Sequence, residues 1–107
     1  MSIFTTKPIK EIIIKEFKTL IANKPISISR HALDHLSESQ RKVFKEEDLC
    51  NMLKGETPRK VYLQKNGRYA AYFRKKDGFR KLIIEQEKEC NVIVTFADPP
   101  ELPKIRL

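Results

Sequence analysis

The chain of 107 residues is 40% hydrophobic and 34% charged, which is typical of a folded domain rather than a disordered segment. Its net charge of +8 favours a polyanionic partner such as RNA or another nucleic acid. The first ten residues lack the apolar core of a signal peptide and no apolar run is long enough to cross a bilayer, so we expect a cytoplasmic protein that does not bind membranes.

The first predicted element is a helix within residues 1–24. Thr6 is a suitable N-cap, and Pro8 fits the first turn of a helix. Apolar residues then recur at helical spacing, at Ile9, Ile12, Ile13, Phe17, Leu20 and Ile21. Residues 23–25 end this helix, and Pro25–Ile28 is predicted to be a short extended link.

Two shorter helices are predicted next. Ser29 can cap a helix over residues 29–36, and this helix would carry His31 and His35 on one flank because they are four residues apart. A third helix begins in the acidic run at residues 46–48 and ends at Gly55, a residue that favours the helix C-terminus.

The second half of the chain has the alternating pattern of strands. We predict four of them, at residues 61–65, 68–75, 79–86 and 91–97. Asn66-Gly67 and Asp77-Gly78 predict tight hairpin turns, and Lys88-Glu89 supplies a third connection. Residues 98–107 are predicted to be an irregular tail, because the prolines after Asp98 end the sheet. The pattern predicts one α+β domain over residues 1–107, with N-terminal helices packed on a four-stranded antiparallel meander.

Alternation along the second and fourth strands predicts which side chains share a face. On the second strand, one face carries Arg68, Ala70, Tyr72 and Arg74, and the other carries Tyr69, Ala71, Phe73 and Lys75. On the last strand, Val92, Val94 and Phe96 are expected in the core. Thr95 would then point to the opposite side, either as an ordinary strand former or as a hydroxyl on a functional surface.

The positive charge is concentrated in one window of the sequence. Between residues 59 and 81 there are nine basic residues and one acid, Asp77, whereas the rest of the chain is neutral overall. The basic residues are Arg59, Lys60, Lys65, Arg68, Arg74, Lys75, Lys76, Arg80 and Lys81. Such a cluster predicts a site for a phosphate backbone. The alternative is a lysine-rich solvated surface that reflects genome composition.

His31 and His35 are the two histidines, and three interpretations stay open for them. They could serve in ordinary packing, or as two ligands of a metal site for which no third ligand is evident. They could also be catalytic, because nearby cations keep an imidazole neutral and able to accept a proton from a ribose 2′-hydroxyl. Cys50 and Cys90 are expected to be reduced thiols, with a disulfide as the alternative. Nucleotide-binding loop motifs are absent from the sequence, so we expect no cofactor, and the lack of a third ligand leads us to expect no metal.

Several short runs are similar to a domain-of-unknown-function family assigned to the barnase–EndoU–colicin–RelE superfold, which contains many RNase toxins. The runs are Ser29–His35, Phe44–Leu49, Leu53–Glu56 and Val92–Phe96, and the resemblance covers residues 27–97. It implies a RelE-like fold and metal-independent RNA cleavage, in which the 2′-oxygen attacks the adjacent phosphate. His31 and Thr95 match the family's histidine and late-strand threonine, whereas His35 stands where the family has arginine. Arg74 or Arg80 would stabilise the charged phosphorane.

Three hypotheses follow for the function. The first is an endoribonuclease, of the kind that forms the toxin half of a toxin–antitoxin pair with an acidic antitoxin. The second is a non-catalytic RNA- or DNA-binding protein that uses the basic strands together with Tyr62, Tyr69 and Tyr72. The third is a structural or host-interaction protein.

Overall fold

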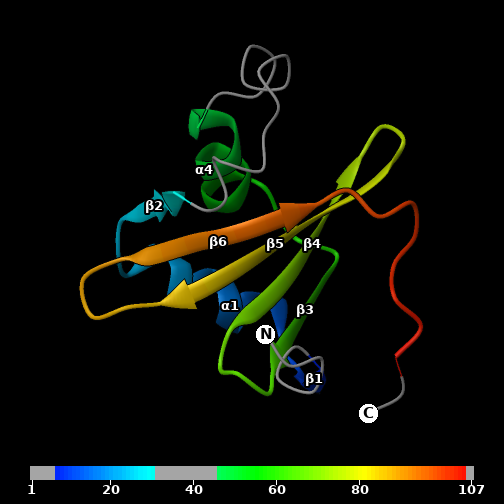
Figure 1. The fold of residues 1–107 in the computed structure, drawn as a ribbon, viewed down its shortest axis with the longest axis horizontal. Coiled ribbons are helices and arrows are strands. Elements are labelled where there is room, and N and C mark those ends of the chain that lie inside the picture. Colours follow the sequence, from blue (N-terminus) through cyan, green and yellow to red (C-terminus); the bar gives the residue numbers. More distant parts are fainter. Residues whose placement is uncertain (1–6, 31–45, 106–107) are drawn as a thin grey trace.

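The computed structural model describes residues 7–30 and 46–105, and within them the fold is α+β (Figure 1). Two helices accompany a six-stranded open sheet whose strand order is β1-β3-β4-β5-β6-β2. In chain order the elements are β1 (Pro8–Glu11), α1 (Ile14–Ala22), β2 (Ile26–Ile28), α4 (Glu46–Gly55), β3 (Lys60–Gln64), β4 (Tyr69–Lys75), β5 (Gly78–Gln86) and β6 (Asn91–Ala97). Neither helix of this described part is long and apolar enough to span a bilayer.

The strands β3 to β6 lie side by side in chain order and pair antiparallel. The predicted glycine turns join the first three of these strands, and both glycines take positive φ angles, 86° at Gly67 and 144° at Gly78. The predicted number of four strands is nevertheless wrong, because β1 and β2 extend the sheet at its two edges.

The N-terminal helix is shorter than predicted and begins later. Residues Pro8–Glu11 form β1, an edge strand paired antiparallel with β3, and the helix begins at Ile14. The Ile12 N–H donates to the Val61 carbonyl at 2.8 Å, which continues the pairing beyond the strand. Proline is tolerated at a sheet edge, and a run of β-branched isoleucines suits an extended chain better than a helix.

The predicted extended link after α1 is a strand. Ile26–Ile28 forms β2, which pairs parallel with β6, so that Ile28 stands beside Ile93. Asn91 is fully buried at the start of β6. Its side-chain amide donates to the Ile21 carbonyl at 3.2 Å and joins this strand pair to α1. From His31 onward, the predicted helix over residues 29–36 lies outside the described residues. The third predicted helix is confirmed as α4, which ends at Gly55.

Both described helices pack on one face of the sheet, which we call the helix face. Phe17 and Ile21 of α1, with Leu49 and Leu53 of α4, cover a layer of sheet side chains. That layer comprises Val61, Ala71, Phe73, Leu82, Ile84 and Ile93. The alternation predicted for β4 is therefore confirmed, since Ala71 and Phe73 face the helices and Ala70 and Tyr72 face away.

The alternation predicted for β6 is interrupted. The register shifts between Ile83 and Ile84 of β5, which pair with Thr95 and Ile93, so that Val94 is an extra residue. A residue inserted in this way reverses the alternation beyond it. Ile93 therefore joins the helix-face core while Val94 packs on the opposite face, which corrects the predicted core positions of this strand.

The C-terminal tail covers the face opposite the helices, which we call the tail face. Residues 98–105 contain neither helix nor strand and leave the end of β6 along one side of the molecule (Figure 1). Leu102 and Ile105 pack against the second apolar cluster, formed by Tyr62, Ala70, Tyr72 and Ile83.

Candidate nucleic-acid interface

The nine basic residues of the window fall into two groups along β4. Lys65 and Arg68 lie at the turn between β3 and β4, and the other seven extend from the middle of β4, where Lys60 and Lys81 pair with Tyr72, to the turn between β4 and β5. Because β4 has seven residues, its two ends are about 20 Å apart. We call the second group the hairpin-end cluster: Arg59, Lys60, Arg74, Lys75, Lys76, Arg80 and Lys81.

Strand register places part of this cluster on the tail face. Tyr72 of β4 pairs with Lys60 of β3 on one side and with Lys81 of β5 on the other. Directly paired residues in a sheet point to the same face, and residues two apart along a strand do so as well. Lys60, Lys81 and Arg74 therefore share the tail face with Tyr72. Thr95 is half-buried on the same face, opposite Ile83.

Lys81 is held against the sheet. Its ammonium lies 5.7 Å from the centroid of the Tyr72 ring, a favourable cation–π arrangement. Partial burial lowers the pKa of Lys81 and raises the pKa of Tyr72, because burial disfavours the charged form of each group.

Arg80 and Lys75 point to the helix face and bind Asp98. Arg80 is 5% exposed, and its guanidinium donates to both oxygens of Asp98, at 2.9 Å and 3.2 Å, while the Lys75 ammonium donates at 3.1 Å. Partial burial raises the pKa of Asp98, but hydrogen bonds and charge attraction from Arg80 and Lys75 outweigh it and hold that pKa below its usual value. Arg80 is therefore already engaged by a carboxylate.

Arg74, the other candidate for stabilising a phosphorane, is exposed. Its guanidinium lies 5.2 Å from the centroid of the Phe79 ring, the directly paired residue on β5. Within the described residues no carboxylate pairs with it. Arg74 thus presents its hydrogen-bond donors to solvent.

Two further basic residues are partly neutralised. Lys60 pairs with Glu11 at 3.0 Å, and Arg68 pairs with Glu85 at 3.4 Å. The hydrogen bond from Lys60 to Glu11 raises the pKa of that lysine. In the part of the chain that the structure describes, the window cations that are exposed and lack a carboxylate partner are Arg59, Lys65, Arg74 and Lys76.

The tyrosines are not open to solvent. Tyr62 and Tyr72 are 4% and 6% exposed, and they meet edge-to-face with their centroids 6.1 Å apart. Tyr69 lies on the helix face with its ring 5.9 Å from that of Phe17. Base stacking needs an accessible ring face, so these side chains do not form an open stacking platform in this conformation.

His31 and His35 lie outside the described residues, but the chain just before them is fixed. The Ser29 N–H donates to the Ile93 carbonyl at 2.9 Å, and the Ser29 hydroxyl donates to the Val94 carbonyl at 2.8 Å. Ser29 is therefore bound to β6 immediately before Thr95. No local pattern predicts this hydrogen bond, because it joins residues 65 positions apart.

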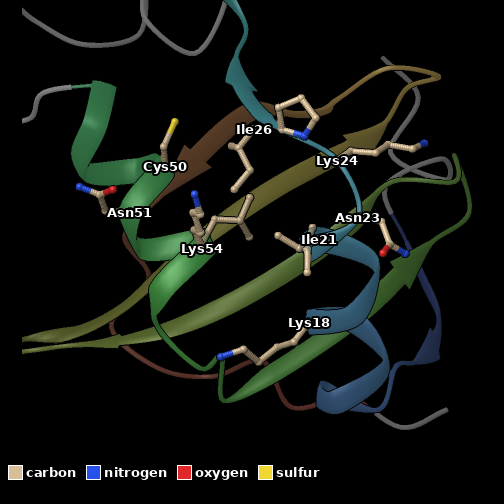
Figure 2. A pocket seen from close by; sticks show the side chains of 11 residues that line it. Lys18, Ile21, Asn23, Lys24, Ile26, Cys50, Asn51 and Lys54 are labelled. Atoms are coloured by element: carbon tan, nitrogen blue, oxygen red, sulfur yellow. The ribbon is translucent and has the colours of Figure 1, made fainter.

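Apart from the basic cluster, the molecule has a concave site on the helix side, between α1, β2 and α4 (Figure 2). It has a volume of about 830 Å³ and an apolar floor that includes Ile21 and Ile26, and three lysines are among its lining residues. Lys24 donates to the Glu87 carbonyl and extends away from α4, whereas Lys18 reaches toward Thr57 in the loop after α4. Because the lysines diverge, this pocket lacks the convergent charge of a phosphate site.

No protein-family model matches the chain, and neither does any curated protein sequence or solved structure. Among the described residues, no three His, Cys, Asp or Glu side chains are grouped as metal ligands. The functional proposals below rest on the chemistry of the hairpin end.

Proposed function

We propose that this protein binds RNA in the cytoplasm through the hairpin end of its sheet. The observation that carries this proposal is that Arg59, Arg74 and Lys76 are exposed, lack carboxylate partners in the described chain and lie between the middle of β4 and the turn that follows it. Cations without internal partners can bind phosphates without first breaking an ion pair. Each phosphate that they neutralise releases counterions, which is the main source of affinity for nucleic acid.

The local structure favours arginine as the phosphate ligand. The Arg59 N–H donates to the Tyr72 carbonyl at 2.7 Å, which fixes the Arg59 backbone beside β4. Arg74 stands on the neighbouring strand, and its side chain is supported by the Phe79 ring. A guanidinium held in this way can donate two hydrogen bonds to a single phosphate.

The test is the salt dependence of RNA affinity. The dissociation constant of a labelled single-stranded RNA with 2′-O-methyl riboses would be measured by fluorescence anisotropy at several salt concentrations. The logarithm of the association constant falls linearly with log[salt]. If Arg74 binds a phosphate, Arg74→Gln makes this fall less steep by about 0.7, the value for one contact with a single strand.

The matched control is Lys88→Gln. Lys88 is exposed in the turn between β5 and β6, at the far end of β5 from the hairpin end, and the substitution removes the same unit of charge. It should leave the slope unchanged. Equal effects of the two substitutions would mean that net charge alone drives binding, and a wild-type affinity indifferent to salt would refute the proposal.

A second proposed function is metal-independent RNA cleavage by a RelE-like fold, favoured by the attachment of Ser29 to β6 beside Thr95. In this reaction the ribose 2′-oxygen gives its proton to the imidazole of His31 and bonds to the adjacent phosphorus, and the 5′-oxygen leaves with a proton. The products are a 2′,3′-cyclic phosphate and a 5′-hydroxyl. Arg74 rather than Arg80 would stabilise the phosphorane, because Arg80 is held by Asp98. An acidic antitoxin would cover the same cations.

Cleavage and binding separate in one experiment. In buffer with a chelator, wild-type protein should cut unmodified RNA but not the 2′-O-methyl analogue. His31→Ala should lower the cleavage rate by about 100-fold or more while the affinity for the analogue stays the same. Affinity without any cleavage by the wild type would leave RNA binding as the function, and cleavage retained by His31→Ala would remove this histidine from the mechanism.

A further inference from the structure

The tail is attached to the sheet by few interactions. Pro99, Pro100 and Pro103 have no backbone N–H to donate. Beyond Asp98, the backbone hydrogen bond that joins the described tail to the sheet runs from the Phe79 N–H to the Pro99 carbonyl, at 3.0 Å. Leu102 is only partly buried, as is Ile105. A segment held in this way separates from the rest of a fold at low cost.

The tail also packs incompletely on the strands. An open hollow of about 450 Å³ lies between it and the sheet, lined by Tyr72, Lys81 and Ala97 on the sheet side and by Asp98, Pro99, Glu101 and Pro103 on the tail side. The tail therefore covers the tyrosine rings through Leu102 and Ile105 but leaves a gap beside Tyr72 and Lys81.

The surface under the tail suits nucleobases. The rings of Tyr62 and Tyr72 lie next to each other there, with the small side chain of Ala70 in the same cluster. Tyrosine rings on a sheet are the usual surface on which single-stranded nucleic acids stack their bases.

Cations flank these rings. Lys60 and Lys81 stand on either side of Tyr72 in the sheet, and Arg74 lies two residues further along β4. Within the described chain, the Lys81 ammonium has no carboxylate at ion-pair distance. The phosphates on either side of a base stacked on Tyr72 would therefore meet positive charge.

We propose that unpaired bases of single-stranded RNA stack on Tyr62 and Tyr72, and that residues 99–105 form a strap that leaves the sheet when they do. This inference rests on the proposed RNA binding and specifies its substrate class. Duplex RNA keeps its bases stacked on one another and offers only phosphates to the hairpin end, so it binds without displacing the strap.

The first test uses the unmodified chain. Hydrogen exchange would be followed at the Phe79 amide, with and without a saturating single-stranded 2′-O-methyl oligonucleotide. If the strap leaves, this amide loses the Pro99 carbonyl and should exchange about tenfold faster or more in the complex. The Ile12 amide, bonded to the Val61 carbonyl on the other edge of the sheet, is the internal control and should not change.

Anisotropy on the same samples separates the two proposals. Bound RNA with an unchanged Phe79 amide overturns the strap and leaves RNA binding at the hairpin end intact. Absence of binding overturns both. Duplex RNA that accelerates Phe79 exchange as much as single-stranded RNA does would contradict the proposed preference for unpaired bases.

The second test loosens the strap. The double substitution Leu102→Ser with Ile105→Ser should raise the affinity for single-stranded RNA about tenfold, because RNA no longer has to displace the tail. The control Ile13→Ser replaces an isoleucine that is 70% exposed near α1 and should leave the affinity unchanged. If the double variant does not fold, Ile105→Ser alone serves.

Stacking is tested in the loosened background. Adding Tyr72→Leu there should remove the gain, since base stacking on an aromatic ring contributes a factor of about 5 to 150. A loosened variant with wild-type affinity, or one whose gain survives Tyr72→Leu, overturns the inference.

Discussion

Asp98 is the reason why Arg80 is held in an ion pair while Arg74 is exposed to solvent. It follows β6 directly and accepts hydrogen bonds from Arg80 and Lys75, so two of the seven hairpin-end cations are held by one carboxylate. Arg80 is nearly buried, and removing Asp98 would take two acceptor oxygens from a guanidinium with limited access to water. The ion pair gives Asp98 and Arg80 a structural role, and the proposed contact with phosphate falls to Arg74.

Asp98→Asn should lower the free energy of unfolding by about 1–2 kcal/mol at pH 7, less than for a fully buried pair because the carboxylate is partly exposed. The pKa of Asp98 in the folded protein lies below the ordinary value of 3.8 for an aspartate. The ion pair of Asp98 with Arg80 therefore stabilises the fold fully above pH 3.8. Its contribution is lost as the pH falls through the pKa that Asp98 has in the folded protein. Urea denaturation should show a gap between wild type and variant that narrows below pH 3.8.

Glu89→Gln is the control for this substitution. Glu89 is exposed in the turn between β5 and β6, and no cation of the described chain pairs with it. Its replacement should change stability by less than about 0.5 kcal/mol at any pH. A gap for Asp98→Asn that persists unchanged in acid would contradict the assigned ion pair.

At the level of single residues, sequence reasoning placed the β4 side chains correctly and missed their partners. Alternation assigns Tyr72 and Arg74 to one face and Phe73 and Lys75 to the other, as the structure has them. The partners of the ion pairs could not be predicted in the same way. Asp98 lies 18 residues from Arg80, and nothing in a local pattern indicates that they meet.

The turn between β4 and β5 is the element on which the tail rests. A Cβ atom added at Gly78 would lie 3.0 Å from the Pro99 carbonyl oxygen and 3.1 Å from the Pro100 Cα, in addition to the strain of a φ near 144°. At Gly67, the equivalent glycine of the turn between β3 and β4, the φ is 86° and no atom lies within 4 Å of an added Cβ.

Gly78→Ala should therefore destabilise the protein more than Gly67→Ala does. Gly67→Ala introduces backbone strain alone, about 1–2 kcal/mol, whereas Gly78→Ala adds a collision with the tail backbone. We expect an additional loss of about 1 kcal/mol in urea denaturation. This additional loss of stability should disappear when Leu102→Ser and Ile105→Ser are also present. If it persists there, the tail stays in place even when these two contacts are removed.

At the level of elements, the predictable parts were those specified locally. Asn66-Gly67 and Asp77-Gly78 demand positive φ, and the turns formed there. In contrast, β1 was predicted as a helix because its isoleucines continue the helical spacing of α1, and β2 was predicted as a link because three residues carry too little pattern. Both are edge strands whose structure depends on pairing with β3 and β6, which a local pattern does not contain.

Across the whole molecule, the sheet separates two environments. Helices and the larger apolar core lie on one side, and a loosely attached tail lies over aromatic rings and cations on the other. The hairpin-end cluster has side chains on both faces of the sheet. Lys75 and Arg80 point to the helix face, and Arg74 and Lys81 point to the tail face. The overall α+β class could be predicted because helical spacing prevails in the first half of the sequence and alternation in the second, whereas the placement of the tail on a sheet face could not.

RNA binding at this end should stabilise the fold. At a free concentration 100 times the dissociation constant, 2′-O-methyl single-stranded RNA should add about 2.7 kcal/mol, which raises the melting temperature of a domain of this size by about 10 °C or more. Displacement of the strap would be included in the measured dissociation constant. Differential scanning fluorimetry checks this, and about 0.5 M salt should largely abolish the shift. A shift insensitive to salt would indicate a ligand held by something other than its phosphates.

The parallel pairing of β2 with β6 has a consequence for synthesis of the chain. Ser29 bonds to Val94, 65 residues later, so this edge of the sheet cannot assemble until β6 has been made. At ordinary translation rates, β6 follows β2 after about 3 to 13 seconds. During that delay Ile26 and Ile28 have no partner strand, and the nascent protein is most exposed to misassembly at its N-terminal third.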